Sequence, residues 1–253
     1  MSACYSIRMP EEAAFFRLLE GLPRQGPGSD ACTRAALDRL PPLPPAPRVL
    51  DLGCGAGRQT LVLAEALQTR VVAIDLHQPF LDQLRASARA RGLSHLVETR
   101  RADMGALDLA PGSVDLLWSE GAIYLLGFAA GLRRWRPLLA PGGLVAVSEC
   151  SWLSEDPPAE ALAFFAAGYP GMGTVAQNRA RAEHAGFEPL ESWPLPAAAW
   201  WDDYYTPLSA RIAALEGDPA LAGPIAETRR EIELFRRHGD SYGYVFYLLR
   251  AAG

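Results

Sequence analysis

The sequence contains no lysine, since every one of the 24 side chains counted as Lys or Arg is an arginine. This absence excludes two kinds of site: a Schiff base on a lysine amine, and a P-loop whose closing lysine reaches a bound phosphate. Cysteine is also scarce, and its four positions show no Cys-x-x-Cys spacing. Such usage is typical of a reduced, cytoplasmic protein without a disulfide framework.

Long hydrophobic runs are missing too. No apolar run approaches the roughly 20 residues of a membrane span, and the first residues lack the basic-then-apolar pattern of a secretory signal. We therefore expect a soluble, cytoplasmic protein that does not contact membranes. The net charge of −5 and the scattered arginine doublets argue against a nucleic-acid partner. No two of the four histidines have the spacing of metal ligands, so no metal site is predicted.

The middle of the chain alternates between strand-like and helical periodicity. Buried apolar strands that alternate with helices are typical of parallel sheets, so we predict an α/β fold with a doubly wound, mostly parallel sheet. The expected strands are 49–52, 71–75, 97–101, 114–119 and 144–149, and the expected helices between them are 60–68, 80–91 and 124–139.

Both flanks of this core differ from it. Helices are expected at 11–20 and at about 30–40, followed by a proline-rich connector. Two late strands, 187–196 and 242–250, are predicted to form an antiparallel hairpin at the sheet edge, with helical insertions before and between them. We predict one domain over residues 1–253, divided into an N-terminal helical lid and linker (1–47), a cofactor-binding core (48–150), and insertions with C-terminal strands (151–253).

Three glycines stand within five residues of the loop "DLGCGAG", between the first strand and the next helix. Glycine weakens strands and helices alike, so this density needs a reason. Gly53, Gly55 and Gly57 indicate a ligand that lies against bare backbone, beside the free N–H groups of a helix N-terminus.

Four interpretations of this loop compete. A dinucleotide site has the spacing Gly-x-Gly-x-x-Gly, unlike the Gly-x-Gly-x-Gly found here, and a P-loop needs the missing lysine. A tight turn without any ligand would explain the glycines alone. S-adenosylmethionine has an adenosine but no pyrophosphate, and two acids suit it. Asp51 can orient its cationic amino-acid end, and Asp75, followed by Leu76 at the next strand end, can accept hydrogen bonds from its ribose.

Two later strand ends complete the predicted cofactor site. Asp103 and Met104 follow the third strand, where Asp103 can accept a hydrogen bond from an adenine amine and Met104 can contact the ring. Asp103 alone could equally cap a helix. Ser119 and Glu120 end the fourth strand beside the glycine loop, and we expect them to border the methyl group of the cofactor.

Taken in order, "VLDLGCGAG", "VVAID", "RAD", "VDLLWSEGAIY" and "LLAPGGLVAVSE" resemble the motifs of class I S-adenosylmethionine-dependent methyltransferases over residues 48–149. The likeness is greatest to small-molecule enzymes of the ubiquinone and menaquinone biosynthesis type, and to a bacterial group with "QGPGS" and "SECSW". It implies a seven-stranded sheet whose last strand is antiparallel, S-adenosylmethionine as cofactor and a small-molecule methyl acceptor. The implied cofactor contacts are Gly53, Gly55, Asp75, Asp103 and Met104.

The stretch "SEGAIY" departs from the Asn/Asp-Pro-Pro-aromatic signature of nucleic-acid amine methylases, so DNA methylation is not expected. Glu120 is the first candidate for a general base, and Tyr124 is the second. Each has a structural alternative, since Glu120 could only fix its loop and Tyr124 could only pack in a helix. Glu149 could contact substrate or stay solvated, and His77 is expected at the ribose rim.

Further features bear on the acceptor and on assembly. Gln25 and Ser29 are expected to close over the cofactor as part of the lid. An aromatic group in the late part of the chain is predicted either to wall a substrate pocket or to pack on the sheet. Its members are Trp200, Trp201, Tyr204 and Tyr205, with Trp152 and Tyr5. The apolar insertions make a homodimer plausible. Two other functions stay open: a non-catalytic S-adenosylmethionine-binding protein, and a nicotinamide-dependent oxidoreductase, which would lack the lysine of a Tyr-x-x-x-Lys pair.

Overall fold

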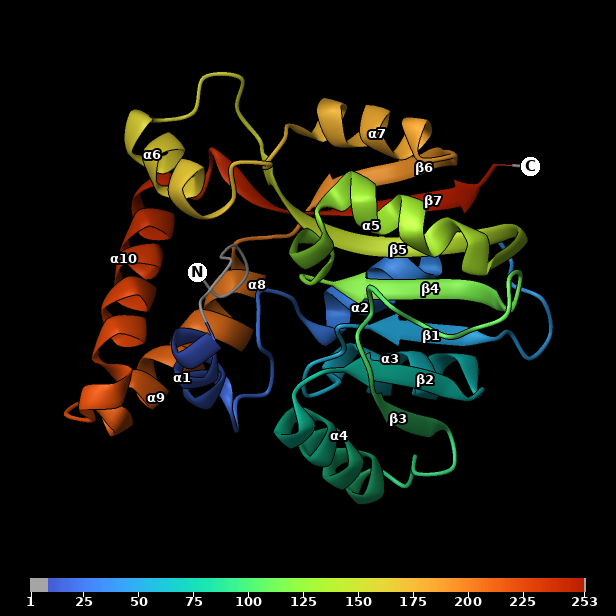
Figure 1. The fold of residues 1–253 in the computed structure, drawn as a ribbon, viewed down its shortest axis with the longest axis horizontal. Helices are drawn as coiled ribbons and strands as arrows, with labels where there is room; N and C mark the ends of the chain where they lie inside the picture. The colour runs from blue at the N-terminus through green and yellow to red at the C-terminus, as the bar shows by residue number, and fades with distance from the viewer. Residues whose placement is uncertain (1–8, 253) are drawn as a thin grey trace.

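The computed structural model describes residues 9–252. Its centre is a seven-stranded sheet with the strand order β3-β2-β1-β4-β5-β7-β6 (Figure 1). The strands β1 to β5 pair in parallel, whereas β7 lies antiparallel between β5 and β6. This arrangement confirms the predicted doubly wound, mostly parallel sheet and the antiparallel pair at its edge.

The seven strands follow the predicted hydrophobic runs. They are β1 (Val49–Leu52), β2 (Val71–Asp75), β3 (Val97–Arg101), β4 (Val114–Glu120), β5 (Leu139–Trp152), β6 (Phe187–Pro194) and β7 (Tyr242–Ala251). All four residues of β1 are buried, because this short strand has a neighbour on either side and helices on both faces.

Helices cover both faces of the sheet. On one face lie α2 (Asp30–Asp38), α3 (Arg58–Leu67) and α4 (Gln78–Ala90), which contribute buried side chains such as Leu63 and Phe80. On the other face lie α5 (Phe128–Trp135) and α7 (Val175–His184), whose Leu132 and Ala182 belong to a second core cluster. The sheet is therefore doubly wound, with its core on both sides.

The remaining helices lie beyond the carboxyl ends of the parallel strands, on the left in Figure 1. They come from the N-terminal segment and from the two predicted insertions. They are α1 (Met9–Leu19), α6 (Ala159–Gly168), α8 (Ala198–Trp200), the π-helical η3 (Trp201–Tyr205), α9 (Thr206–Leu215), the short η4 (Pro219–Leu221) and α10 (Ala222–His238). Ligands of open α/β sheets bind beyond these strand ends, so the helices are placed to roof a site.

One predicted helix, 124–139, is wrong. Gly127 has φ 75° and ψ 129°, which no α-helix accommodates, and it divides the segment into the 3₁₀ turn η1 (Ile123–Leu126) and α5. A second 3₁₀ turn, η2 (Arg136–Leu138), leads directly into β5. The "APGG" stretch, which precedes the expected strand 144–149, therefore lies inside β5, and the pairing of β4 with β5 shifts register there.

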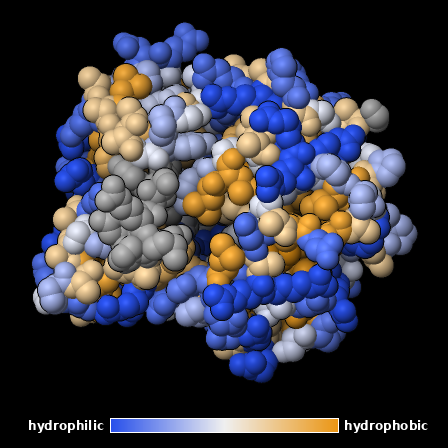
Figure 2. All heavy atoms as spheres, viewed as in Figure 1, coloured by the Kyte–Doolittle hydropathy of each residue, from blue (hydrophilic) through white to orange (hydrophobic). Residues whose placement is uncertain are grey.

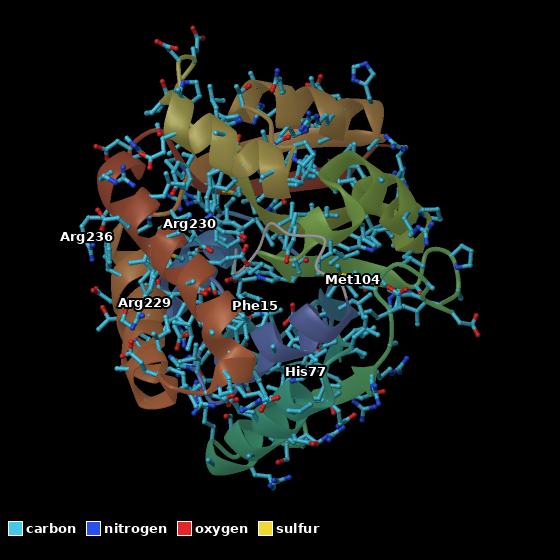
Figure 3. All side chains as sticks on the ribbon, turned by 60° about the vertical axis from the view of Figure 1, so that its left-hand side comes forward. Phe15, His77, Met104, Arg229, Arg230 and Arg236 are labelled. Carbon is cyan, nitrogen blue, oxygen red and sulfur yellow. The ribbon has the colours of Figure 1, made fainter. Side chains whose placement is uncertain are left out.

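Two of the arginine doublets, Arg229-Arg230 and Arg236-Arg237, belong to α10 and lie on its solvent-exposed face. Arg229 pairs with Glu216 at 2.8 Å, and Arg236 pairs with Glu233, all with exposed side chains. Figure 3 shows Arg229, Arg230 and Arg236 along α10, toward the outside of the molecule. The face seen in Figure 2 mixes hydrophilic and hydrophobic groups, with hydrophobic ones gathered near its middle. Across residues 9–252, no helix has the length and apolar character that crossing a membrane requires.

Candidate functional site

A cavity of about 410 Å³ opens at the carboxyl ends of β1, β2 and β4. This volume is within the usual range for small-molecule and cofactor sites. Its wall combines α1 and the loop that follows it, the glycine loop, the ends of β2 and β3, and the stretch after β4. Phe15 of α1 and Met104 after β3 both line it, and Figure 3 shows them toward the middle of the molecule.

The glycine loop turns sharply from β1 into α3. Gly53, Gly55 and Gly57 have φ values of 66°, 53° and 75°, in the left-handed region that glycine adopts without strain. A side chain at Gly53 would also collide with Ala122 at 2.4 Å, and one at Gly57 with Leu84 at 2.3 Å. Gly53 and Gly55 line the cavity, whereas Gly57 begins α3 and packs against α4.

Asp75 lies at the end of β2 and lines the cavity, with the exposed Leu76 beside it. Its two carboxylate oxygens accept hydrogen bonds from the backbone N–H groups of Gly55 and His77, both at 2.8 Å. Burial raises the pKa of Asp75, and these backbone donors oppose the rise. Each oxygen keeps a second lone pair, so the carboxylate can accept further hydrogen bonds.

Asp51 lies beneath the glycine loop with no exposed surface, and it is not part of the cavity wall. Its Oδ2 atom accepts a 2.5 Å hydrogen bond from the Thr60 hydroxyl, while Oδ1 has no hydrogen-bond partner among the described residues. Burial raises the pKa of Asp51 to about 7. An unsatisfied carboxyl oxygen in a buried position is costly, which points to a missing donor.

The loop after β3 and the end of β4 contribute unequally. Asp103 and Met104 line the cavity, and Asp103 accepts a 2.7 Å hydrogen bond from the Gly105 backbone N–H. Ser119 does not line it. The Ser119 hydroxyl instead donates to the carbonyl of Leu52 at 2.8 Å, which ties the end of β4 to the end of β1.

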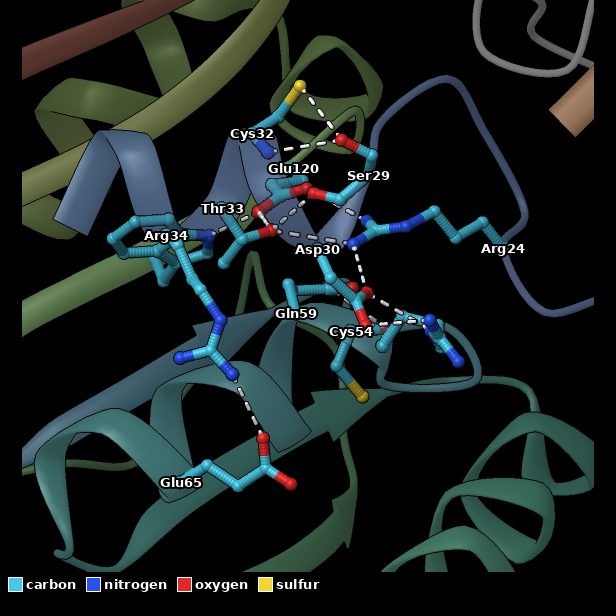
Figure 4. A network of polar contacts seen from close by, with 12 residues as sticks. Arg24, Ser29, Asp30, Cys32, Thr33, Arg34, Cys54, Gln59, Glu65 and Glu120 are labelled. Atoms are coloured by element: carbon cyan, nitrogen blue, oxygen red, sulfur yellow. Dashed lines mark hydrogen bonds and ion pairs between the residues drawn. The ribbon is translucent and has the colours of Figure 1, made fainter. Parts of the chain in front are cut away.

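Glu120 is the centre of a buried polar network that the sequence did not indicate (Figure 4). Its Oε1 accepts hydrogen bonds from the Thr33 hydroxyl at 2.7 Å and from the Trp118 indole N–H at 2.8 Å. Its Oε2 lies 3.1 Å from the Arg24 guanidinium, and these two side chains are only 6% and 5% exposed. All three donors already engage this carboxylate.

The network continues to the glycine loop. Arg24 also contacts Asp30 at 3.1 Å, and Asp30 pairs in a bidentate manner with Arg58, the first residue of α3, at 3.1 and 2.6 Å. Arg24, Asp30 and Arg58 were not among the predicted site residues. Arg24 and Asp30 are 6 positions apart, but no local signal marks the network, because Arg58 lies 28 positions from Asp30 and Glu120 lies 96 positions from Arg24.

The two predicted lid residues take different positions. Gln25 reaches the glycine loop, where its Oε1 accepts a 2.6 Å hydrogen bond from the Ala56 backbone N–H. That oxygen occupies the space in which a side chain at Gly55 would stand, 2.5 Å from its Cβ position. Ser29 does not reach the loop, because it caps the N-terminus of α2.

The remaining titratable candidates lie at different depths. Tyr124 lines the cavity from η1, and its ring contacts that of Tyr169 at 6.0 Å between centroids. Glu149 has no exposed surface and does not line the cavity, so it is not solvated. Burial raises the pKa of Glu149 to about 8, against the opposing effects of Tyr169 and Arg181. The His77 ring instead contacts Glu20 at 2.9 Å, next to Phe16 and Phe80.

The late aromatic residues belong to the core. Trp200, Tyr204 and Tyr205 are at most 3% exposed, and none of them lines the cavity. Trp200 stacks on Phe235 of α10 with ring centroids 4.1 Å apart. Trp201 and Trp152 likewise contact neighbouring aromatic rings away from the cavity, and Tyr5 lies outside the described residues. The packing alternative therefore holds for the described members of this group.

The sheet order, the glycine loop and the acidic strand ends together define a nucleoside-binding α/β fold. Residues 49–143 match the family model described as a methyltransferase domain. The trans-aconitate 2-methyltransferase of Methylobacterium nodulans is 31% identical over 75% of this chain and 72% of its own length. The chain therefore belongs to the class I S-adenosylmethionine-dependent methyltransferases, and S-adenosylmethionine is its cofactor.

Two further comparisons agree with this assignment. The trans-aconitate 2-methyltransferase of Azoarcus sp. is 35% identical over 71% of this chain, and the match spans 64% of that relative's length. The crystal structure of an S-adenosylmethionine-dependent methyltransferase from Geobacter sulfurreducens, in complex with S-adenosyl-L-homocysteine, has a TM-score of 0.79 at 19% identity. It covers 94% of this chain and 97% of its own, and it shows the same fold.

Proposed function

We propose that this protein transfers a methyl group from S-adenosylmethionine to a small-molecule acceptor. The observation that carries the proposal is the cavity of about 410 Å³, which brings the glycine loop, Asp75 and the end of β4 to one place. The carboxyl group of Asp51, buried below the same loop, supports it, since its negative charge would favour a cationic ligand group in the cavity above.

The proposed cofactor residues divide by position. Gly53 and Gly55 would admit the cofactor against the backbone, and Asp75 with Leu76 would hold its ribose. Asp103 and Met104 would meet the adenine, and Asp51 would orient the ammonium group. The remaining two act indirectly, because Gly57 shapes the start of α3 and Ser119 holds β4 against β1. The sulfonium of the bound cofactor makes its methyl group electrophilic, so the protein's task is to align the acceptor and exclude water.

The two predicted bases have different surroundings. Tyr124 lines the cavity from η1 and is placed to contact an acceptor. The Glu120 carboxylate also reaches the wall, but Thr33, Trp118 and Arg24 already donate to it. To accept a proton from an acceptor, Glu120 would have to give up one of these bonds. We therefore assign Glu120 mainly to holding the N-terminal segment, and Tyr124 to acceptor positioning or proton transfer.

Other finer predictions belong with this proposal. The names of two relatives raise trans-aconitate as a candidate acceptor. We also propose that the single domain consists of a lid and linker (1–47), a cofactor-binding core (48–150) and a C-terminal part (151–253). A cytoplasmic location and a homodimer are further proposals. Size-exclusion chromatography with light scattering tests the homodimer directly.

Calorimetric titration with S-adenosylmethionine and S-adenosylhomocysteine tests the proposal. We expect micromolar binding of both compounds, and a loss of at least tenfold in Asp75→Ala because two ribose hydrogen bonds disappear. Asp82→Ala, which removes an exposed carboxylate from α4, is the matched control and should bind like the wild type. If the wild type binds neither compound, the proposal fails.

A methyl-transfer assay then separates catalysis from binding alone. Labelled cofactor is incubated with a metabolite extract, and labelled products are identified by mass spectrometry. Transfer that depends on the protein supports the enzyme. Tight binding without any transfer would favour the alternative of a non-catalytic S-adenosylmethionine-binding protein.

A further inference from the structure

We infer that the acceptor has an apolar body and carries no net negative charge, so that it is not a polycarboxylate or a phosphate ester. The inference rests on the proposed function and names the substrate class of the same site. It depends on how the charges around the cavity are paired, and on which side chains form the part of the wall contributed by α1 and η1.

The cations of the cavity wall are already neutralised. Among the described lining residues they are Arg24 and Arg58. Arg24 is 5% exposed and is held between Glu120 and Asp30, both at 3.1 Å. Arg58 makes a bidentate pair with the same Asp30 at 3.1 and 2.6 Å. Arg24 cannot turn to an anionic acceptor without leaving the buried Glu120 carboxylate unpaired, which is costly. Arg58, whose pair with Asp30 is about one-third exposed, would have to share its guanidinium with that carboxylate.

Carboxyl groups outnumber these cations. Asp75, Asp103 and Glu120 line the cavity, Asp30 adjoins it through the two arginines, and Asp51 lies beneath the glycine loop. Within residues 9–252, two cations thus face five carboxyl groups. The bound cofactor adds a single net positive charge, so its presence leaves no positive excess. A second or third negative charge on an acceptor would meet no complementary group, which is an effective way to reject it.

The wall away from the strand ends is apolar. Phe15, Phe16 and Leu19 of α1 face the cavity, and Tyr124 and Leu125 of η1 also line it. Leu125 is 58% exposed, an unusual state for a leucine beside a cavity, and an apolar acceptor would cover it. These side chains can hold an aromatic or aliphatic body while one hydroxyl, thiol or deprotonated amine is presented to the methyl group.

The first experiment sorts acceptors by charge before the reaction. A metabolite extract is divided by ion exchange at pH 7 into uncharged, anionic and cationic fractions, and each is incubated with labelled cofactor and protein. We expect at least tenfold more labelled product from the uncharged and cationic fractions together than from the anionic fraction. Label mainly from the anionic fraction, or from none of them, overturns the inference.

A binding experiment distinguishes a failure of the proposed methyltransferase function from a failure of the inferred acceptor class. Binding of S-adenosylhomocysteine is measured first, and its failure would remove the proposed function rather than the acceptor class. Titration of trans-aconitate into the protein–S-adenosylhomocysteine complex follows. We expect no measurable heat below millimolar concentration, and micromolar binding would overturn the inference while leaving the methyltransferase proposal intact.

Asp30→Asn tests whether ion pairing is the cause. This variant frees the Arg58 guanidinium and half of the Arg24 contacts, so its complex should bind trans-aconitate at least tenfold more tightly than the wild-type complex. Glu65→Gln is the matched control, since it removes the same charge from the partner of Arg34 outside the cavity. An equal gain in the control, or none in a folded Asp30→Asn, contradicts the proposed cause. If Asp30→Asn does not fold, the sorted extract decides the question.

Discussion

At the scale of single residues, two buried carboxyl groups stand out. Asp51 and Glu149 have no exposed surface, and burial raises their pKa values to about 7 and about 8. Buried carboxyl groups with strongly raised pKa values are frequent at functional sites, where a ligand or another group interacts with them. For Asp51 the sequence predicts a partner, the cationic end of the cofactor, because this residue stands at the head of the glycine loop.

If Asp51 orients the cationic end of the cofactor as proposed, cofactor binding should depend on pH. A positive ligand group favours the ionised carboxylate, so below its pKa of about 7 the protein must lose a proton when it binds. We expect the affinity for S-adenosylhomocysteine to rise severalfold from pH 6 to pH 8 and then to level off. Calorimetry in two buffers of different ionisation enthalpy should detect the released proton. Asp51→Asn should bind more weakly and without this pH dependence, and an unchanged pH dependence would contradict the assignment.

Glu149 should lower the stability of the free protein as the pH rises from 4.5 to 8. Its pKa is about 8 in the folded state and near 4.5 when unfolded, so the unfolded chain loses this proton first as pH rises. The free energy of unfolding should therefore fall between pH 4.5 and 8, by up to about 5 kcal/mol from linkage. In Glu149→Gln the part of this fall that Glu149 causes should disappear, so that urea unfolding shows a more stable variant at pH 8 and similar stabilities at pH 4.5.

Glu155→Gln, at an exposed position, is the control and should follow the wild type at every pH. A wild-type stability that rises from pH 5 to 8 would contradict the description of Glu149. Asp51 should add an effect of the same sign, since its pKa is raised as well.

At the scale of elements, the strand–loop–helix unit of β1 and α3 was predicted because its signal is local. Four apolar or buried strand residues, three glycines and a helix lie within 19 consecutive residues, from Val49 to Leu67. The segment 124–139 failed for the opposite reason. Its composition suits a helix throughout. The helix is interrupted only because Gly127 adopts a non-helical backbone conformation, which separates η1 from α5.

Gly57→Ala should show that this loop is shaped by packing as well as by backbone freedom. Gly57 has φ 75°, and a Cβ atom there would lie 2.3 Å from Leu84 of α4. We expect a loss of about 2–4 kcal/mol, of which about 1 comes from the left-handed backbone and the rest from overpacking. Gly92→Ala is the matched control, because its φ is 71° and no atom lies within 4 Å.

Chemical denaturation of both variants measures the difference. Gly92→Ala should lose only about 1 kcal/mol. Equal losses in the two variants would show that Leu84 yields freely and that the loop does not depend on this contact.

At the scale of the whole molecule, one carboxylate joins three distant segments. Glu120 ends β4, Arg24 and Thr33 come from the N-terminal segment, and Asp30 extends the network to Arg58 at the glycine loop. Gln25 adds a second attachment of the same segment to that loop. The N-terminal segment thus forms part of the cavity wall through defined contacts, which the sequence indicated only as a general lid.

Glu120→Gln distinguishes an anchor from a base. As an anchor it should lose about 2–4 kcal/mol, because Arg24 keeps its charge in a buried position with one partner fewer. Trypsin should then cut sooner within residues 17–34, and the pH profile of methyl transfer should keep its shape. Glu188→Gln, which breaks an exposed pair with Arg250, should change neither property. Unchanged stability together with a lost acid limb of the pH profile would make Glu120 the base.

The sequence by itself determined the features that neighbouring residues encode. The alternation of strands and helices, the glycine loop and the acids at the ends of β2 and β3 follow from periodicity, backbone freedom and short spacings, so they were predicted with their residue numbers. Only the tertiary structure decided that Glu120 is held by Arg24 and Thr33, that α1 walls the cavity, and that the late aromatic residues pack in the core. Such partners are 87 or more positions apart in the case of Glu120, and which of them meet depends on how complete elements pack together.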